Sequence, residues 1–150
     1  MGEALLRRKT RLIEGDDTLD AAALTTGDYT NIKQKVEIKQ KLNLTAVKYK
    51  ARSTGNHTLR IWNEAETELL HEQIDSISNA NAFHTFELGD AIKMLSGTNY
   101  HFQFLRPSAQ VYRPTNNYIG TVWDGNIVWF GGDEFSNRCL AMGLVYVYYA

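Results

Sequence analysis

The sequence predicts an all-β protein, a two-sheet antiparallel β-sandwich of jelly-roll type with about nine or ten short strands. Apolar and polar residues alternate from residue 32 onward, as in strands that bury one face. Turn-forming residues separate the alternating stretches at short intervals. Eight Tyr and six Phe against only two Pro also favour strands. The connections are too short for helical crossovers, so antiparallel pairing is expected.

The individual strands follow from the same alternation. The first is I32-K-Q-K-V-E-I-K39, in which Val36 and Ile38 alternate with charged residues. V47-K-Y-K-A-R52 and H57-T-L-R-I-W-N63 come next, separated by the turn signal S53-T-G-N56. Further strands are expected at residues 83–88, 100–105 and 109–113, in a hairpin over 118–130, and at 139–150. Shorter apolar stretches at residues 42–44, 65–70 and 91–95 connect them.

The N-terminal part of the chain has a different pattern. Residues 1–31 are predicted to form an arm or linker, ahead of a β-sandwich domain that spans residues 32–150. The spacing of Leu5 and Leu12, seven residues apart, is compatible with a short helix in the arm. Two interpretations stay open: a connecting arm, or a stem that joins the domain to a larger fibre or to sister subunits.

Composition excludes several kinds of partner. The chain has 16 Lys and Arg against 17 Asp and Glu, so it lacks the overall basic field that drives nucleic-acid binding. No stretch approaches the roughly 18 apolar residues of a membrane span. Cys139 is the only cysteine, and its apolar surroundings are typical of a buried thiol. Neither nucleic-acid binding nor membrane insertion is expected.

Alternation also predicts a candidate binding face. In each of three strands one set of side chains is apolar and should face the core, so the other set should face outward. If these strands share a sheet, its outer face carries the ligand-binding candidates Lys48, Lys50, Arg60, Trp62, His101 and Gln103. An aromatic ring would stack on a sugar while the polar groups bond its hydroxyls or acidic groups. The alternative is an ordinary solvated face with one tryptophan packed by its neighbours.

The stretch Y118-I-G-T-V-W-D-G-N-I-V-W-F130 predicts a hairpin with a two-residue Asp-Gly turn. In that register Trp123 and Trp129 lie on opposite faces, and only one face of a two-layer sandwich is internal. We therefore expect Trp123 to point inward, and Trp129 to stand beside Tyr118 on the outer face. Such an apolar outer face needs a cover. The N-terminal arm, a sister subunit or a glycan would each supply one.

The C-terminal strand favours the sister subunit. V145-Y-V-Y-Y149 is apolar or aromatic on both faces, so Tyr146 and Tyr148 join Tyr118 and Trp129 as candidates for an oligomer interface or a second aromatic platform. A homo-oligomer, with a trimer favoured, is the prediction.

Motifs for chemistry are absent from the sequence. The four histidines show no metal-ligand spacing, and neither a nucleophile elbow nor a phosphate-binding loop occurs. The nearby carboxylates at positions 16, 17, 20, 133 and 134 indicate solvated loops, and no calcium-binding signature supports a structural Ca²⁺. We expect a protein that is not an enzyme and that has no cofactor and no catalytic metal, and a structural Ca²⁺ stays an open alternative.

Two stretches carry a family resemblance. T45-A-V-K-Y-K-A-R-S-T-G-N-H-T-L-R-I-W-N-E-A-E-T-E-L-L70 and E87-L-G-D-A-I-K-M-L-S-G-T-N-Y-H-F-Q-F104 resemble jelly-roll modules of bacteriophage tail and other virion proteins, and carbohydrate-binding modules of secreted bacterial proteins. The likeness covers roughly residues 32–106. It implies an appended binding or virion-decoration domain, and it brings no fixed set of binding residues.

The expected function is that of a non-catalytic β-sandwich module on a virion or in the extracellular space. It would bind a host-surface carbohydrate, as a receptor-binding or adhesion domain. One alternative is a purely structural, oligomerising fibre or tail domain with no glycan ligand. Another is a carbohydrate-binding module of a secreted glycoside hydrolase.

Overall fold

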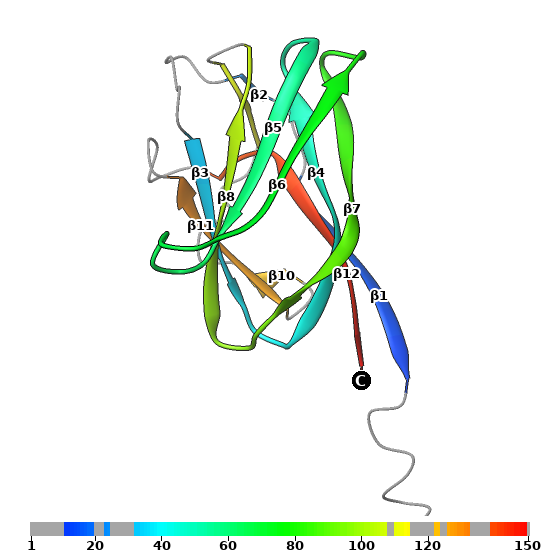
Figure 1. Cartoon of the computed structure of the whole chain (residues 1–150), viewed down its shortest axis with the longest axis vertical. Helices are drawn as coiled ribbons and strands as arrows, with labels where there is room; N and C mark the ends of the chain where they lie inside the picture. Colours follow the sequence, from blue (N-terminus) through cyan, green and yellow to red (C-terminus); the bar gives the residue numbers. More distant parts are fainter. Residues whose placement is uncertain are drawn as a thin grey trace, which may run out of the picture.

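The structure, a computed structural model, describes residues 11–19, 23–24, 32–107, 110–114, 122–123, 126–132 and 139–149. These residues form strands, turns and loops without a helix. Two main antiparallel sheets make up most of the described residues, as Figure 1 shows. The predicted all-β sandwich is confirmed.

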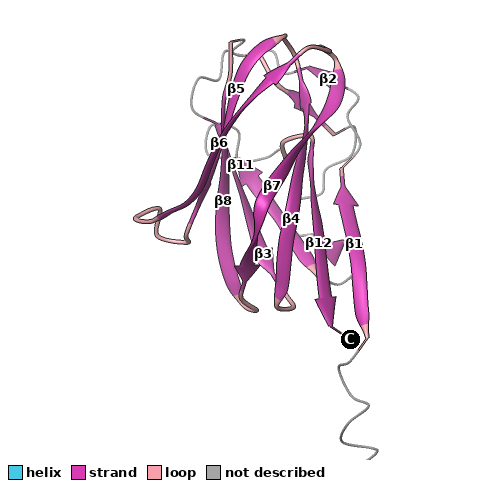
Figure 2. Ribbon diagram, turned by 45° about the vertical axis from the view of Figure 1, so that its right-hand side comes forward, coloured by secondary structure: helices cyan, strands magenta, loops and turns pink. Residues whose placement is uncertain are grey.

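The four-stranded sheet has the order β1-β12-β4-β7 and is seen from its outer side in Figure 2. Its strands are β1 (Leu12–Thr18), β12 (Met142–Tyr149), β4 (Leu42–Ala51) and β7 (Ala82–Met94).

The six-stranded sheet has the order β10-β11-β3-β8-β5-β6. Its strands are β10 (Val122–Trp123), β11 (Ile127–Gly132), β3 (Ile32–Ile38), β8 (Thr98–Leu105), β5 (Gly55–Trp62) and β6 (Leu69–Ile77). The short strands β2 (Ala23–Leu24) and β9 (Tyr112–Arg113) pair only with each other.

The strand order is that of a jelly roll. Strands β1-β12-β4-β7 lie opposite β3-β8-β5-β6, so successive strands of the chain cross repeatedly between the two sheets. The hairpin of β10 and β11 extends the second sheet beyond β3. The two main sheets together hold four plus six strands, which agrees with the predicted number.

The start of the domain lies earlier than predicted. Leu12–Thr18 was assigned to the N-terminal arm, but it forms β1 and pairs over its whole length with β12. The proposed helix is therefore wrong for these residues, because the backbone pairing of the C-terminal strand outweighs a weak helical spacing. Residues 1–10 lie outside the described residues.

The core lies between the sheets and follows the period-two pattern. Each of β3, β4, β5 and β8 buries the apolar set that alternation predicted. Tyr49 of β4 and Phe104 of β8 stack across the interior with ring centroids 4.3 Å apart, and Phe86 of β7 packs beside both. Cys139 is buried, as predicted.

Candidate functional site

The six residues predicted to share one face are divided between the two sheets. Lys48 and Lys50 lie on β4 of the four-stranded sheet, and the other four lie on β5 and β8 of the six-stranded sheet. The prediction of a shared face is therefore wrong. The turn after β4 carries the chain from one sheet to the other, and alternation within a strand gives no information about sheet membership.

The residues on β5 and β8 do lie together on the outer face of the six-stranded sheet. The register pairs Arg60 with Gln103 and Trp62 with His101. The indole nitrogen of Trp62 donates a hydrogen bond of 2.9 Å to Oε1 of Gln103. His101 is 7% exposed and Gln103 is 5% exposed, so neighbouring side chains cover the groups that were expected to meet a ligand.

The loop between β5 and β6 closes over this patch. The carbonyl oxygen of Glu64 lies 3.2 Å from Nε2 of His101, and the carboxylate of Glu66 pairs with Nζ of Lys33 at 2.8 Å. The hydrogen bond from Lys33 lowers the pKa of Glu66, so the pair stays charged well below neutral pH. Nζ of Lys33 also lies 6.0 Å from the centre of the Trp62 ring. These side chains therefore form a network of contacts between strands, covered by the β5–β6 loop, and not an open binding surface.

The other predicted ligand-binding residues also have partners within the chain. Nε of Arg60 lies 2.6 Å from Oε2 of Glu72, and Nζ of Lys48 lies 2.6 Å from Oδ2 of Asp16. The ammonium group of Lys50 lies 4.5 Å from the centre of an aromatic ring. Exposed pairs of this kind add little stability, but they orient the side chains on the surface.

Among the described residues, the aromatic side chains predicted to form an outer face do not do so. Trp129 is fully buried and Tyr146 is 1% exposed, and both belong to the core between the sheets. Tyr148 is partly buried, with its ring centroid 6.0 Å from that of Tyr146. Tyr118 lies outside the described residues. Assigning Trp129 and Tyr146 to an outer surface was wrong.

A register difference of one residue explains the error for Trp129. The predicted two-residue turn pairs Val122 with Ile127, whereas the structure pairs Val122 with Val128. In a strand, a shift of one residue moves every side chain to the opposite face. Trp129 consequently pairs with the inward-facing Val36 of β3 and faces the core.

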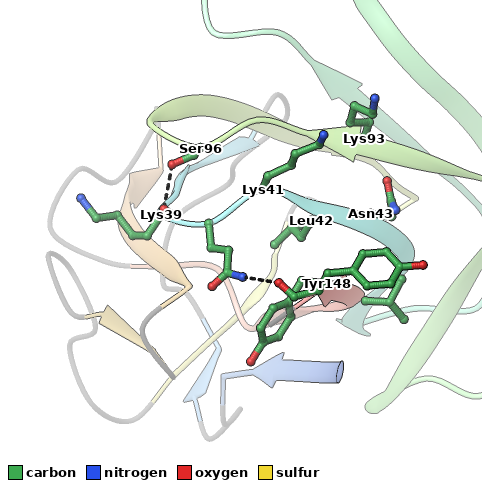
Figure 3. A pocket seen from close by; sticks show the side chains of 10 residues that line it. Lys39, Lys41, Leu42, Asn43, Lys93, Ser96 and Tyr148 are labelled. Atoms are coloured by element: carbon green, nitrogen blue, oxygen red, sulfur yellow. Dashed lines mark hydrogen bonds between the residues drawn. The ribbon is translucent and has the colours of Figure 1, made fainter. Parts of the chain in front are cut away.

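A groove that the sequence did not reveal lies at one end of the four-stranded sheet, shown in Figure 3. The turn between β3 and β4, the end of β7 and the end of β12 meet there. The groove has a volume of about 790 Å³. Its lining includes Lys39, Lys41, Lys93, Asn43, Tyr148 and Tyr149. We call it the lysine groove.

Hydrogen bonds between distant segments hold the walls of the lysine groove. Nε2 of Gln40 donates to the carbonyl oxygen of Tyr149 at 3.1 Å, which ties the β3–β4 turn to the end of β12. The hydroxyl of Ser96 donates to the carbonyl oxygen of Lys39 at 2.8 Å, and the amide of Gly97 donates to the end of β3 at 2.7 Å. Gly97 has a φ of 75°, a value that suits glycine in this tight turn. These hydrogen bonds fix the positions of the segments that line the lysine groove.

The floor of the lysine groove is the outer face of the sheet itself. Asn43 on β4 pairs with Lys93 on β7 and with Val147 on β12, so the three side chains form one row across three strands. Their neighbours in sequence, Leu44 and Tyr146, are buried on the inner side. This row therefore projects away from the core.

The lysine groove carries a local excess of positive charge. Lys39 lies 3.5 Å from the carboxylate of Glu37, whereas Lys41 and Lys93 form no ion pair with any described residue. Both are exposed. Glu14 on β1 pairs with Val147 and so lies in the same row across the sheet as Asn43 and Lys93. Two ammonium groups in the groove are left to attract an anionic group.

The described residues contain no group of three or more His, Cys, Asp or Glu side chains that could hold a metal ion. Asp17 is buried inside the sandwich, and Asp16 pairs with Lys48 on its surface, so neither lies in the solvated loop that was expected. The remaining loop carboxylates, at positions 20, 133 and 134, lie outside the described residues. In the same part of the chain, no helix has the length and apolar character needed to cross a membrane.

No protein-family model matches the chain, and no curated protein is similar to it in sequence.

Proposed function

We propose that this chain is a non-catalytic jelly-roll module that binds an acidic carbohydrate in the lysine groove. The observation that carries the proposal is the meeting of three lysines, two tyrosines and two amide side chains around about 790 Å³. Ammonium groups attract carboxylate or sulfate groups, amides bond hydroxyls, and aromatic rings pack on the apolar faces of sugars. We propose no reaction and no cofactor.

The biological setting of the proposal rests on the resemblance over residues 32–106 to virion and carbohydrate-binding modules. We propose adhesion to a host-surface glycan by a virion or extracellular protein. A purely structural fibre or tail domain, and a module of a secreted glycoside hydrolase, remain the alternatives. A homotrimer also stays a prediction, but Trp129 and Tyr146 no longer supply its interface because they are buried.

The charge distribution favours an acidic glycan over a nucleic acid. The formal net charge of the chain is −1, and the same sheet face that carries the lysine groove also carries Glu14, Asp16 and Glu87. A continuous polyphosphate would meet these carboxylates along its length. A glycan with spaced acidic groups can place one of them in the groove.

The test is binding of acidic and neutral oligosaccharides on a glycan array, followed by calorimetric titration of the acidic ones. Lys41→Glu and Lys93→Glu should each weaken binding of an acidic oligosaccharide at least tenfold. The matched control is Lys35→Glu, which makes the same charge change on the outer face of the six-stranded sheet. This control should bind as the wild type does.

Three results would contradict the proposal. The first is a failure of every acidic oligosaccharide to bind. The second is equal weakening by Lys35→Glu, which would show a nonspecific charge effect. The third is stronger binding of a single-stranded oligonucleotide than of any glycan.

A further inference from the structure

A second depression lies farther along the outer face of the same sheet. One row of paired residues crosses all four strands: Thr18 on β1, Gly143 on β12, Lys48 on β4 and Thr85 on β7. Thr18, Lys48 and Thr85 line a hollow of about 480 Å³ together with Asp16 and Phe83. Thr18 occupies the space where a side chain at Gly143 would begin, so the floor of the hollow depends on that glycine. We call this hollow the Phe83 depression.

The groups around the Phe83 depression suit a neutral sugar. Phe83 is 40% exposed and presents an apolar ring. Asp16 accepts hydrogen bonds from Nζ of Lys48 at 2.6 Å and from the hydroxyl of Thr18 at 2.5 Å. Partial burial alone would raise the pKa of Asp16, but these hydrogen bonds outweigh it and lower the pKa. An apolar ring beside paired donors and acceptors matches a sugar, which has one apolar face and hydroxyls that both donate and accept.

The two hollows lie on the same face of the four-stranded sheet, with the paired Val145 and Ala46 between them. Gly143 and Val147 are four residues apart on β12 and project to the same face, which corresponds to about 13 Å at roughly 3.3 Å per residue. Between them Val145 of β12 pairs with Ala46 of β4. Neither side chain is charged or large, so no ridge from these two central strands separates the hollows.

The charge of the sheet surface differs between the lysine groove and the Phe83 depression. Lysines surround the groove at one end, whereas Asp16 on β1 and Glu87 on β7 stand at the outer ends of the Val145–Ala46 row. The ion pair of Asp16 with Lys48 also leaves the Phe83 depression without net charge. The lysine groove, with three lysines in its lining, therefore attracts an acidic group more strongly than the Phe83 depression, where Lys50 is the one further lysine opposite Phe83 in the register.

We infer that the Phe83 depression is a second subsite for the same glycan. The ligand would then be an extended chain that lies across the four-stranded sheet, with an acidic sugar in the lysine groove and a neutral sugar on Phe83, rather than one terminal sugar. This inference rests on the proposed function and adds the class of ligand to it: a polymer in which acidic and neutral units are mixed.

The experiment measures calorimetric affinity against chain length with two probes. Hyaluronan oligosaccharides alternate a uronic acid with a neutral amino sugar, whereas oligogalacturonates carry an acid on every unit. For the wild type, a hyaluronan octasaccharide should bind at least tenfold tighter than the disaccharide, and oligogalacturonate should gain much less with length. Phe83→Ala should remove the gain with length and leave disaccharide binding unchanged. Phe83→Tyr, which keeps the ring, should retain the gain.

The outcomes separate this inference from the proposed function. Equal affinity at all lengths, with binding still lost in Lys41→Glu, would overturn the second subsite and leave the lysine groove standing. An equal loss for short and long ligands in Phe83→Ala would also overturn it. Absence of binding by every acidic oligosaccharide would overturn both.

Discussion

The hydroxyl of Tyr146 provides a sharp test of the polar network inside the sandwich. It donates to Oδ2 of Asp17 at 3.0 Å and accepts from Nδ2 of Asn126 at 3.1 Å. All three residues are at most 5% exposed. Asp17 belongs to β1 of one sheet and Asn126 immediately precedes β11 of the other, so this one hydroxyl links the two layers.

Tyr146→Phe removes the hydroxyl and keeps the ring, so no cavity forms and the packing of the core is retained. Asp17 and Asn126 each lose a partner while remaining buried. A hydrogen bond to a charged group contributes about 1.5–3 kcal/mol, and a buried group left unsatisfied costs about 1–3 kcal/mol. The free energy of unfolding should therefore fall by about 2–3 kcal/mol.

The assay is equilibrium unfolding in urea, with Tyr148→Phe as the matched control. Tyr148 is only partly buried, and its hydroxyl forms no hydrogen bond with a described residue, so the control should change stability by less than about 0.5 kcal/mol. A loss equally small in Tyr146→Phe would refute the reasoning, because it would show that Asp17 and Asn126 do not depend on the hydroxyl.

Three further predictions address other parts of the molecule. Trp129→Ala should lower the free energy of unfolding by about 3–5 kcal/mol because the side chain is fully buried; a variant of unchanged stability and smaller solution mass would support an interface at Trp129 instead. Burial lowers the pKa of His57 below 6.5, so the unfolded chain takes up more protons, and stability should fall as the pH drops below about 6.5. In His57→Gln the urea midpoint should change less between pH 7 and pH 5 than in the wild type. Equal changes in the variant and the wild type would show that His57 does not cause the loss of stability at low pH. Glu14→Gln removes a carboxylate beside the lysine groove and should strengthen binding of an acidic oligosaccharide about twofold at low salt; weaker binding by calorimetry would place the acidic sugar elsewhere.

Strand identity could be predicted because burial in a sheet repeats every second residue. Leu59 and Ile61 face the core, while Arg60 and Trp62 project from the opposite face, as the alternation in β5 indicated. The same rule assigned β3, β4 and β8 correctly. This information is local, since each strand carries its own pattern of apolar and polar residues.

Alternation within a strand could not predict the register between strands or the sheet that each strand joins. A hairpin turn one residue longer than predicted is enough to turn Trp129 from the surface to the core. Likewise, Lys50 and Arg60 are ten residues apart and alternate in the same way, yet the chain crosses between sheets before β5 begins. Turn length and crossover depend on the packing of the whole sandwich.

The lysine groove also combines residues that a local sequence signal indicates with a residue that only long-range strand pairing brings near. Two of its lysines bracket the turn K39-Q-K41, which is a visible local signal, but Lys93 is more than fifty residues away in sequence. The pairing of β7 with β4 places Lys93 opposite Asn43. Only that pairing, together with the return of β12 to the other side of β4, creates a groove.

The sequence by itself thus determined the fold class and, for β3, β4, β5 and β8, the strand and the apolar side chains that it turns inward, because these depend on a period of two along the chain. The tertiary structure decided which outward-facing side chains become neighbours. In this jelly roll, β4, β8 and β12 each pair with strands far away in sequence, so the lysine groove, the Phe83 depression and the network beneath the β5–β6 loop all depend on long-range pairing that no local pattern encodes.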